Sequence, residues 1–479
     1  MSIGKKNWRK WRKSVNKYSC ECVEKQWFDF IDIFDKGSTY RKKQKKIILL
    51  NWYIILQPII DILTSLGVRY GSDSITLGVA IRAVFVGIMA FYVMFIYRGK
   101  YEKAVKIYVA IISVYGLAFL ANAAVCSGTY TIITNIKMFI KMYYFLYVLL
   151  GLFCMYQQYQ YVVSDWLLVG VYCEYTVSIF LSAITNTSFG TYDYGKGYCG
   201  WFYAGNEVGA IISILAIVAL FWAVKSKKKF VWISIGFLCA FSGTYVGTKV
   251  PLLASAMAVI VLGFVCLIQK ILYKTSSRNI IRCVIILLAY CTLYMANSPV
   301  RQNNGIMVTE HYEESVVEKE EALENEENIQ KNKAYLVINW LLSNRLVYVE
   351  GTINRYCTGT VSEKLLGLGY SYTVGKGLNS NLIEMDFLAL LFYHGIVGLM
   401  IYILPICFFA VYCIRALWKA IKKIFENESA IVYTYGILIG LACAAVSGHV
   451  LIAPAVSIYI AILIIKLVDN SDNNLEMLK

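Results

Sequence analysis

Long apolar runs recur along this chain and restrict what it can fold into more than any other feature. Each run holds about 20 residues, the length of an α-helix that crosses the hydrocarbon core of a bilayer. Apolar residues make up 58% of the 479 residues and charged residues only 16%, and the charges cluster between the runs. A soluble protein of this size would need a charged surface around several cores. The sequence therefore predicts an all-α, polytopic integral membrane protein.

The apolar runs predict twelve membrane-spanning helices. They are expected at residues 47–66, 75–97, 104–125, 131–155, 160–184, 205–224, 230–247, 249–269, 279–297, 384–414, 429–448 and 451–468. The first 46 residues hold 14 Lys or Arg against 5 acidic residues and contain no apolar core segment, so we expect no cleavable signal peptide. The first apolar run should therefore remain as a spanning helix.

The expected helices divide the chain into five parts. Residues 1–46 are basic, and aromatic and aliphatic residues from Trp27 to Phe34 recur at helical spacing. This pattern indicates either a short amphipathic helix on the membrane surface or a disordered basic tail. The other parts are helices one to nine (47–297), a large loop (298–383), helices ten to twelve (384–468) and a carboxy-terminal tail (469–479).

Basic residues between alternate runs indicate how the chain is oriented. They include Arg98, Lys100, the KSKKK segment at 225–229, Lys270 and Arg415. Because cytoplasmic loops carry an excess of Lys and Arg, we expect both termini in the cytoplasm and the protein in the bacterial cytoplasmic (inner) membrane. The loops at 185–204 and 298–383 should then face outside, where the chemistry is expected. Since orientation accounts for most of the net charge of +16, nucleic-acid binding has no support.

The large loop carries two arginines that suit an anionic ligand. Its first part holds nine glutamates between residues 310 and 327, which is typical of a solvated strip, and we assign it no catalytic role. Helical periodicity returns around Arg345, and Arg355 follows ten residues later. Guanidinium groups bind phosphate oxygens in a bidentate way, so both arginines are candidate phosphate contacts. The alternative is that each is a surface arginine paired with Glu350 or Glu363.

Several cations are expected inside the membrane, where an ionised side chain needs a partner or a task. Arg82 lies in the second expected span, Lys137 and Lys141 share one face of the fourth, and Lys249 begins the eighth. Cations at similar depth on separate helices could converge on an anion that enters from the outer leaflet. The alternative is that Arg82 pairs with Asp61 and that the lysines extend to the lipid headgroups.

Carboxylates and histidines near the outer surface are candidates for proton transfer and sugar binding. Glu384 and Asp386 stand where the chain re-enters the membrane, and partial burial there would suit a general base. The alternative is a solvated helix start. His394 and His449 are further candidates, although a lone histidine is more often structural. Asn206, in GNEVGA, suits either a helix start or a sugar contact.

Motifs for metal or nucleotide chemistry are absent from the sequence. It contains no GxxxxGK[ST], HExxH or DxD segment, so we expect neither a metal nor a cofactor. Most of the fourteen cysteines lie within apolar runs without metal-binding spacing, which is typical of small core residues. Cys199 and Cys357 are both expected outside, and whether they pair is left open.

A set of short segments, taken in order, resembles a known family. These segments are LQPIIDILTS, ITLGVAIR, GNEVGA, GTYVGTKVPLL, LLSNRLVYV, LLGLGYS, IEMDFLALLFYHGIVG and SGHVLIAP. Together with the twelve spans and the long loop before the tenth, they are similar to the O-antigen ligase and polymerase family of bacterial surface polysaccharide synthesis. The resemblance covers roughly residues 47–468.

The resemblance implies an inverting, metal-independent glycosyltransferase with a helical, lipid-sugar-dependent (GT-C-like) architecture. Its donor would be a glycan linked through diphosphate to undecaprenyl. The arginines of the family carry onto Arg345 and Arg82, whereas Lys249 stands where the family commonly has arginine. In the ligases a histidine lies where the chain re-enters the membrane, and the nearest matching position here is Glu384. This difference favours a polymerase.

The function expected from the sequence is therefore that of a polysaccharide polymerase, with Glu384 and Arg345 as catalytic residues. The remaining candidates for substrate contact are Arg82, Lys137, Lys141, Lys249, Arg355, Asp386, Asn206 and His449. Expected partners are the undecaprenyl-diphosphate-linked oligosaccharide, membrane lipids, and a flippase and chain-length regulator of the same pathway. The alternatives are ligase-type transfer to another acceptor, a flippase for lipid-linked oligosaccharides and a non-catalytic assembly component.

Overall fold

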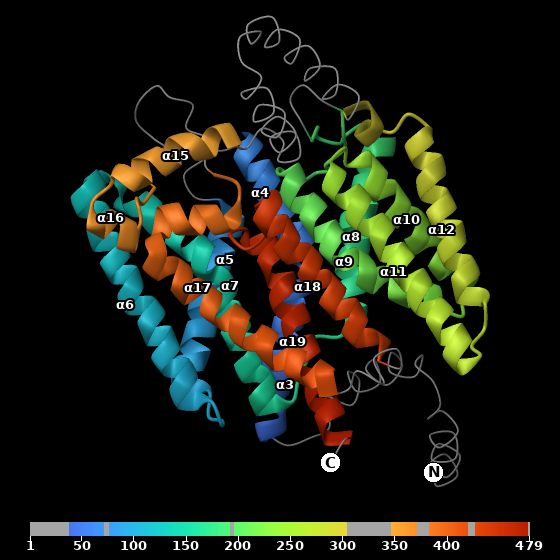
Figure 1. Cartoon of the computed structure of the whole chain (residues 1–479), viewed down its shortest axis with the longest axis horizontal. Coiled ribbons are helices and arrows are strands. Elements are labelled where there is room, and N and C mark those ends of the chain that lie inside the picture. The colour runs from blue at the N-terminus through green and yellow to red at the C-terminus, as the bar shows by residue number, and fades with distance from the viewer. Residues whose placement is uncertain are drawn as a thin grey trace, which may run out of the picture.

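The computed structural model describes residues 38–70, 76–191, 196–303, 346–370, 383–419 and 427–477. Within these ranges the regular structure is helical, apart from an isolated β-bridge between Gly190 and Tyr198. The long helices pack side by side, with α15 and α16 across the upper end of the bundle and the end of α19 at the lower end (Figure 1). This confirms the all-α, multi-pass architecture expected from the apolar runs.

The helices have the following bounds. They are α3 Ser38–Ile55, α4 Gln57–Tyr70, α5 Leu77–Phe91, the π-helical η2 Tyr92–Ile96, α6 Glu102–Ser127, the 3-10 helix η3 Thr129–Thr131, α7 Ile132–Tyr159, α8 Asp165–Ile184, α9 Gly205–Lys225, α10 Lys229–Tyr245, α11 Lys249–Tyr273, α12 Arg278–Met295, α15 Leu346–Thr358, α16 Val361–Leu366, α17 Asp386–Lys419, α18 Glu428–Val446 and α19 Pro454–Met477.

Each of the twelve expected spans falls on a helix, but the first and the seventh do not correspond to a single long helix. Ten helices in the described ranges are long and apolar enough to span a bilayer. The first expected span is instead the pair α3 and α4, bent by 48°. Pro58 lies at this bend, and its nitrogen cannot donate a hydrogen bond to the carbonyl of Ile54. The seventh expected span is α10, which has only 17 residues.

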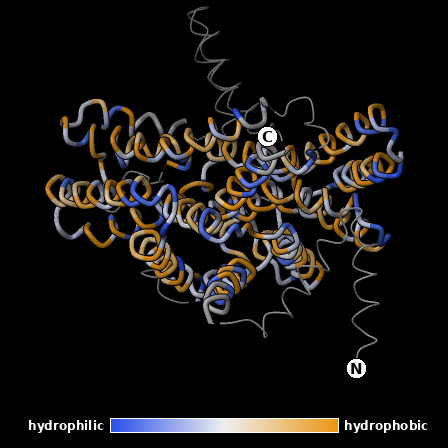
Figure 2. The backbone as a smooth tube through the Cα atoms, turned by 90° about the horizontal axis from the view of Figure 1, so that it is seen from below, coloured by the Kyte–Doolittle hydropathy of each residue, from blue (hydrophilic) through white to orange (hydrophobic). Residues whose placement is uncertain are grey.

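Helices α7, α9 and α19 form the centre of the bundle. Within their most apolar segments 72%, 83% and 89% of the residues are buried, against 22% for the peripheral α12. Hydrophobic residues line most helices when the bundle is viewed from below (Figure 2). A helix that is apolar on all sides lies either inside a protein or against lipid. The buried fractions indicate that α7, α9 and α19 lie inside the bundle and that α12 lies at its edge.

The tenth expected span, α17, is broken near its start at Gly395. This residue has φ 68° and ψ −179°, so the segment 386–394 turns away from the rest of the helix. Glycine is required because an added Cβ would lie 2.4 Å from the carbonyl oxygen of Leu365. The N–H groups of Leu368 and Gly369 donate to carbonyls of the segment before the break, at 2.9 and 3.2 Å. The chain after α16 therefore packs against α17 at this break and pairs with its backbone.

Candidate functional site

The turn between α18 and α19 has an uncommon backbone conformation. Gly448 and His449 both have positive φ, at 68° and 57°. A Cβ at Gly448 would lie 1.4 Å from the carbonyl oxygen of Glu384, so the turn is pressed against the chain that leads into α17. A non-glycine residue at positive φ persists only where its surroundings hold it, and such residues are enriched at functional sites.

Asp386 holds this turn in place. Its side chain is buried, and its carboxylate accepts the N–H groups of His449 at 2.8 Å, Val450 at 3.0 Å and Leu451 at 2.6 Å. Hydrogen bonds to an ionised acceptor are stronger than neutral ones, so a single side chain fixes three successive backbone amides. This placement favours a positioning role for Asp386 over the substrate contact expected from the sequence.

Glu384 and His449 form a pair at the surface of the site. The Nε2 atom of His449 lies 3.7 Å from Oε1 of Glu384, and the two side chains are 32% and 36% exposed, so both are within reach of a ligand. Burial lowers the pKa of His449, but the contact with Glu384 and the charges of Glu207 and Asp386 raise it to a net value above 6.5. The contact with Glu384 therefore favours the protonated form of His449.

Glu207 of α9 and Lys141 of α7 add opposite charges to the site. Glu207 lies in the first turn of α9 and interacts electrostatically with both His449 and Lys141. Lys141, on α7, also interacts with Lys137 one turn earlier and with Arg82 on α5. Glu207 thus places a negative charge near both Lys141 on α7 and His449 on the turn.

Asn206 and Lys249 lie at the same end of the bundle. Asn206 precedes Glu207 in the first turn of α9, one residue beyond the helix start, because Ala204 occupies the N-cap position. Lys249 is the first residue of α11, and its ammonium nitrogen is buried. The preceding residue, Thr248, packs against Gly209 of α9, with Oγ1 lying 3.3 Å from an ideal Cβ there. The structure therefore brings Asn206 and Lys249 to the end of the bundle where Glu207 lies.

Arg82 has protein partners inside the bundle. Its guanidinium forms an ion pair with Asp61 and donates to Oε1 of Gln57 at 3.0 and 3.2 Å. Asp61 in turn accepts the hydroxyl of Tyr175 at 2.5 Å. The pairing with Asp61, which the sequence left open as the alternative, is thus present. A contact between Arg82 and substrate stays a prediction.

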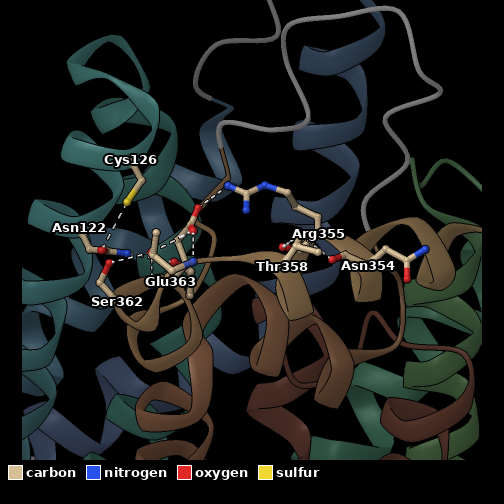
Figure 3. Close-up of polar contacts among 9 residues, drawn as sticks. Asn122, Cys126, Asn354, Arg355, Thr358, Ser362 and Glu363 are labelled. Carbon is tan, nitrogen blue, oxygen red and sulfur yellow. Dashed lines mark hydrogen bonds and ion pairs between the residues drawn. The ribbon is translucent and has the colours of Figure 1, made fainter.

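Arg355 and Glu363 form an ion pair between α15 and α16 (Figure 3). Glu363 also accepts the backbone N–H of Thr360 at 2.7 Å and completes a capping box at the start of α16. Burial raises the pKa of Glu363, but the hydrogen bonds from Thr360 and Arg355 hold it below its usual value. Arg355 therefore has the partner that the sequence offered as the alternative to a phosphate. Arg345 lies outside the described residues.

The remaining candidates have structural surroundings. His394 is fully buried, stacks on Phe119 at 4.5 Å and lies 3.1 Å from the hydroxyl of Tyr370. Cys199 is buried and Cys357 is exposed, and both are free thiols. Within the described ranges no three His, Cys, Asp or Glu side chains form a group that could hold a metal ion.

The site is thus a carboxylate–histidine pair with cations on neighbouring helices, at one end of a membrane-spanning bundle. A family profile described as O-antigen ligase like membrane protein matches residues 42–473, which include all of this site. The chain belongs to this family. No curated protein matches the chain. Membership in the O-antigen ligase like family confirms the resemblance drawn from the short segments and makes the chain a multi-pass membrane protein of polysaccharide ligation or polymerisation.

Two features of this family member were missed by inference from the sequence. Glu207 follows Asn206 in GNEVGA, a segment that suits a helix start or a sugar contact, but the sequence gives no sign of its electrostatic interaction with His449 and Lys141. The role of Asp386 as an acceptor for three amides of a turn 63 to 65 residues later has no local signal. Both depend on contacts between helices that are far apart in the sequence.

Proposed function

We propose that this protein is a polysaccharide polymerase, an inverting and metal-independent glycosyltransferase. It transfers a glycan from undecaprenyl diphosphate onto a lipid-linked repeat unit at the outer face of the cytoplasmic membrane. The observation that carries the proposal is the approach of His449, on a turn that Asp386 holds in place, to within 3.7 Å of Glu384. Family membership supports glycan transfer from a lipid-linked oligosaccharide.

Glu384 is the general base in this proposal. Its carboxylate takes the proton of the acceptor hydroxyl while that oxygen attacks the anomeric carbon of the donor sugar. The bond between this carbon and the diphosphate oxygen breaks on the opposite side, and its electron pair leaves with the diphosphate, which inverts the configuration. His449, held beside Glu384, orients the carboxylate before the proton is transferred.

The cations of the site stabilise the leaving group. Negative charge grows on the diphosphate as the bond breaks, and positioned cations in a water-poor site lower the energy of that state. Lys141 and Lys137 on α7 and Lys249 on α11 supply charge from two helices near the Glu207 end of the bundle. Arg345 belongs to this set by family resemblance.

Polymerase and ligase differ in the acceptor rather than in this chemistry. The polymerase proposal rests on Glu384, a carboxylate where the resembled ligases have histidine. Ligase-type transfer is the second candidate, and the same site serves it. Incubation of the purified protein with lipid-diphosphate-linked repeat units separates the two, because a polymerase yields a ladder of lengthened products. A flippase would move the substrate and yield no new glycosidic bond.

Replacement of Glu384 by glutamine tests the general base. Glutamine keeps the size of the side chain but does not accept the proton, so turnover of the lipid-linked donor and acceptor should fall by about 10² or more. Binding of the lipid-linked substrate should change little. Glu102→Gln is the matched control, since Glu102 pairs with Arg98 and Lys106 near the start of α6. Normal turnover of the Glu384→Gln protein would contradict the assignment.

A further inference from the structure

The loop between α8 and α9 presents aromatic side chains on an ordered frame. The N–H of Phe189 donates to the carbonyl of Gly200 at 2.9 Å, and the N–H of Cys199 donates to the carbonyl of Phe189 at 3.1 Å. Phe202 is buried, with its ring 4.9 Å from that of Tyr175. This anchor fixes the backbone between Trp201 and Tyr203, which lie on either side of it in the chain.

Polar contacts orient these aromatic rings. The indole N–H of Trp201 donates to the hydroxyl of Thr187 at 3.0 Å. The guanidinium of Arg69, at the end of α4, lies 3.7 Å from the ring centre of Phe189 and 5.5 Å from that of Tyr203. Tyr203 is nevertheless 57% exposed. A guanidinium stacked on a ring keeps the N–H groups at its edge free to point elsewhere.

Contacts between side chains link this loop to the helices of the candidate site. Phe202 packs on Tyr175, whose hydroxyl donates to Asp61, the ion-pair partner of Arg82. Tyr203 lies two residues before α9, whose first turn carries Asn206 and Glu207. The loop therefore leads directly into the first turn of α9, where the candidate site begins.

We propose that Arg69, Phe189, Trp201 and Tyr203, here called the aromatic surface, bind sugar residues of the lipid-linked oligosaccharide. A pyranose ring has an apolar face of polarised C–H groups, which the negative face of an aromatic ring attracts, and a rim of hydroxyls, which a guanidinium can bind. Oriented rings beside a cation match this combination. The inference rests on the proposed function and adds the substrate contact that recognises the glycan.

The competing explanation is that these side chains belong to an aromatic belt at the membrane surface, where Trp and Tyr are common. Such a belt would bind lipid headgroups of any kind and would not distinguish a glycan from bare diphosphate. Tyr130, in η3 between α6 and α7, is 81% exposed and provides a matched control because it lies in a different loop.

The test uses two probes, undecaprenyl-diphosphate-linked oligosaccharide extracted from the host membranes and bare undecaprenyl diphosphate. Affinities are measured with wild-type protein and with the Trp201→Ala and Tyr203→Ala variants in lipid nanodiscs. Each variant should lose about tenfold in affinity for the glycosylated probe and less than about twofold for the bare probe, because only the glycosylated probe carries sugar rings that can pack on the aromatic side chains. Tyr203→Phe, which keeps the ring, should recover most of the affinity.

Equal affinities of wild-type and both alanine variants for the glycosylated probe would overturn the inference and leave the proposed function standing. So would an equal loss for the two probes, or an equal effect of Tyr130→Ala, because either result indicates general membrane anchoring. If wild-type protein binds neither probe, the proposed function fails as well, and the inference fails with it.

Discussion

The contact between His449 and Glu384 depends on the backbone conformation of a single residue, His449. His449 stands in a left-handed conformation that three amide hydrogen bonds to Asp386 and the contact between Gly448 and Glu384 impose. Backbone strain of about 1–3 kcal/mol is tolerated where the surroundings hold it, and here it directs an imidazole at a carboxylate. We therefore expect the protonation of His449 to change the stability of the folded protein measurably.

Replacement of His449 by glutamine should remove a pH dependence of stability. The pKa of His449 is raised in the folded protein, so its contribution to stability is complete below the unfolded-state pKa of about 6.5 and is lost as pH rises through the higher folded pKa. The difference in Tm between wild type and His449→Gln, measured in detergent micelles, should be largest at the acidic end of a pH series and shrink above neutrality. A difference that is constant with pH would contradict a charged pair.

The broken helix α17 shows how one element depends on another. The chain after α16 donates two backbone hydrogen bonds to the segment before Gly395, and α16 itself is tied to α15 through Arg355 and Glu363. The side chain of Asn122 on α6 donates to the carbonyl of Gly367 at 3.0 Å. The break is therefore a packed joint that sets the direction of the segment leading back to Glu384.

Gly395→Ala should disrupt this joint. An added Cβ would meet the carbonyl oxygen of Leu365 at 2.4 Å and the backbone nitrogen of Gly367 at 2.5 Å, at a φ of 68° that a side chain disfavours. We expect a loss of both Tm and turnover. Gly351→Ala is the control: this position lies in α15 with nothing within 4 Å of a Cβ, so alanine should be neutral or stabilise by about 0.5–1 kcal/mol. Equal behaviour of the two variants would show that the joint is not needed.

At the scale of the whole molecule, the bundle places its loops at two opposite ends. Helices α15 and α16 lie across one end, and the carboxy-terminal end of α19 lies at the other (Figure 1). The basic segment between α9 and α10 follows Lys225, which forms an ion pair with Glu428 at the start of α18. The excess of basic residues predicts that this second end faces the cytoplasm.

Labelling of intact spheroplasts tests this orientation. A tag within the glutamate-rich segment at 310–327 should react with a membrane-impermeant reagent added outside, because it belongs to the loop before α15. A tag at 225–229 should react only after the membrane is permeabilised. Labelling of the second tag from outside would invert the orientation and move the candidate site to the cytoplasmic face.

The sequence by itself determined the helices, because the length and apolar character of a membrane span are local properties that lipid imposes on any backbone. It also determined the family, and it singled out Glu384, His449 and Lys141 as unusual in their positions.

Only the tertiary structure decided the partners of those residues. Arg82 pairs with Asp61 on α4, and His449 meets a carboxylate 65 residues earlier in the chain. Asp386 proved to hold a turn. Such pairings depend on how helices pack and where they break. Neither is encoded within a single apolar run, because many arrangements of a bundle can bury the same apolar surface, whereas buried charges also need particular partners.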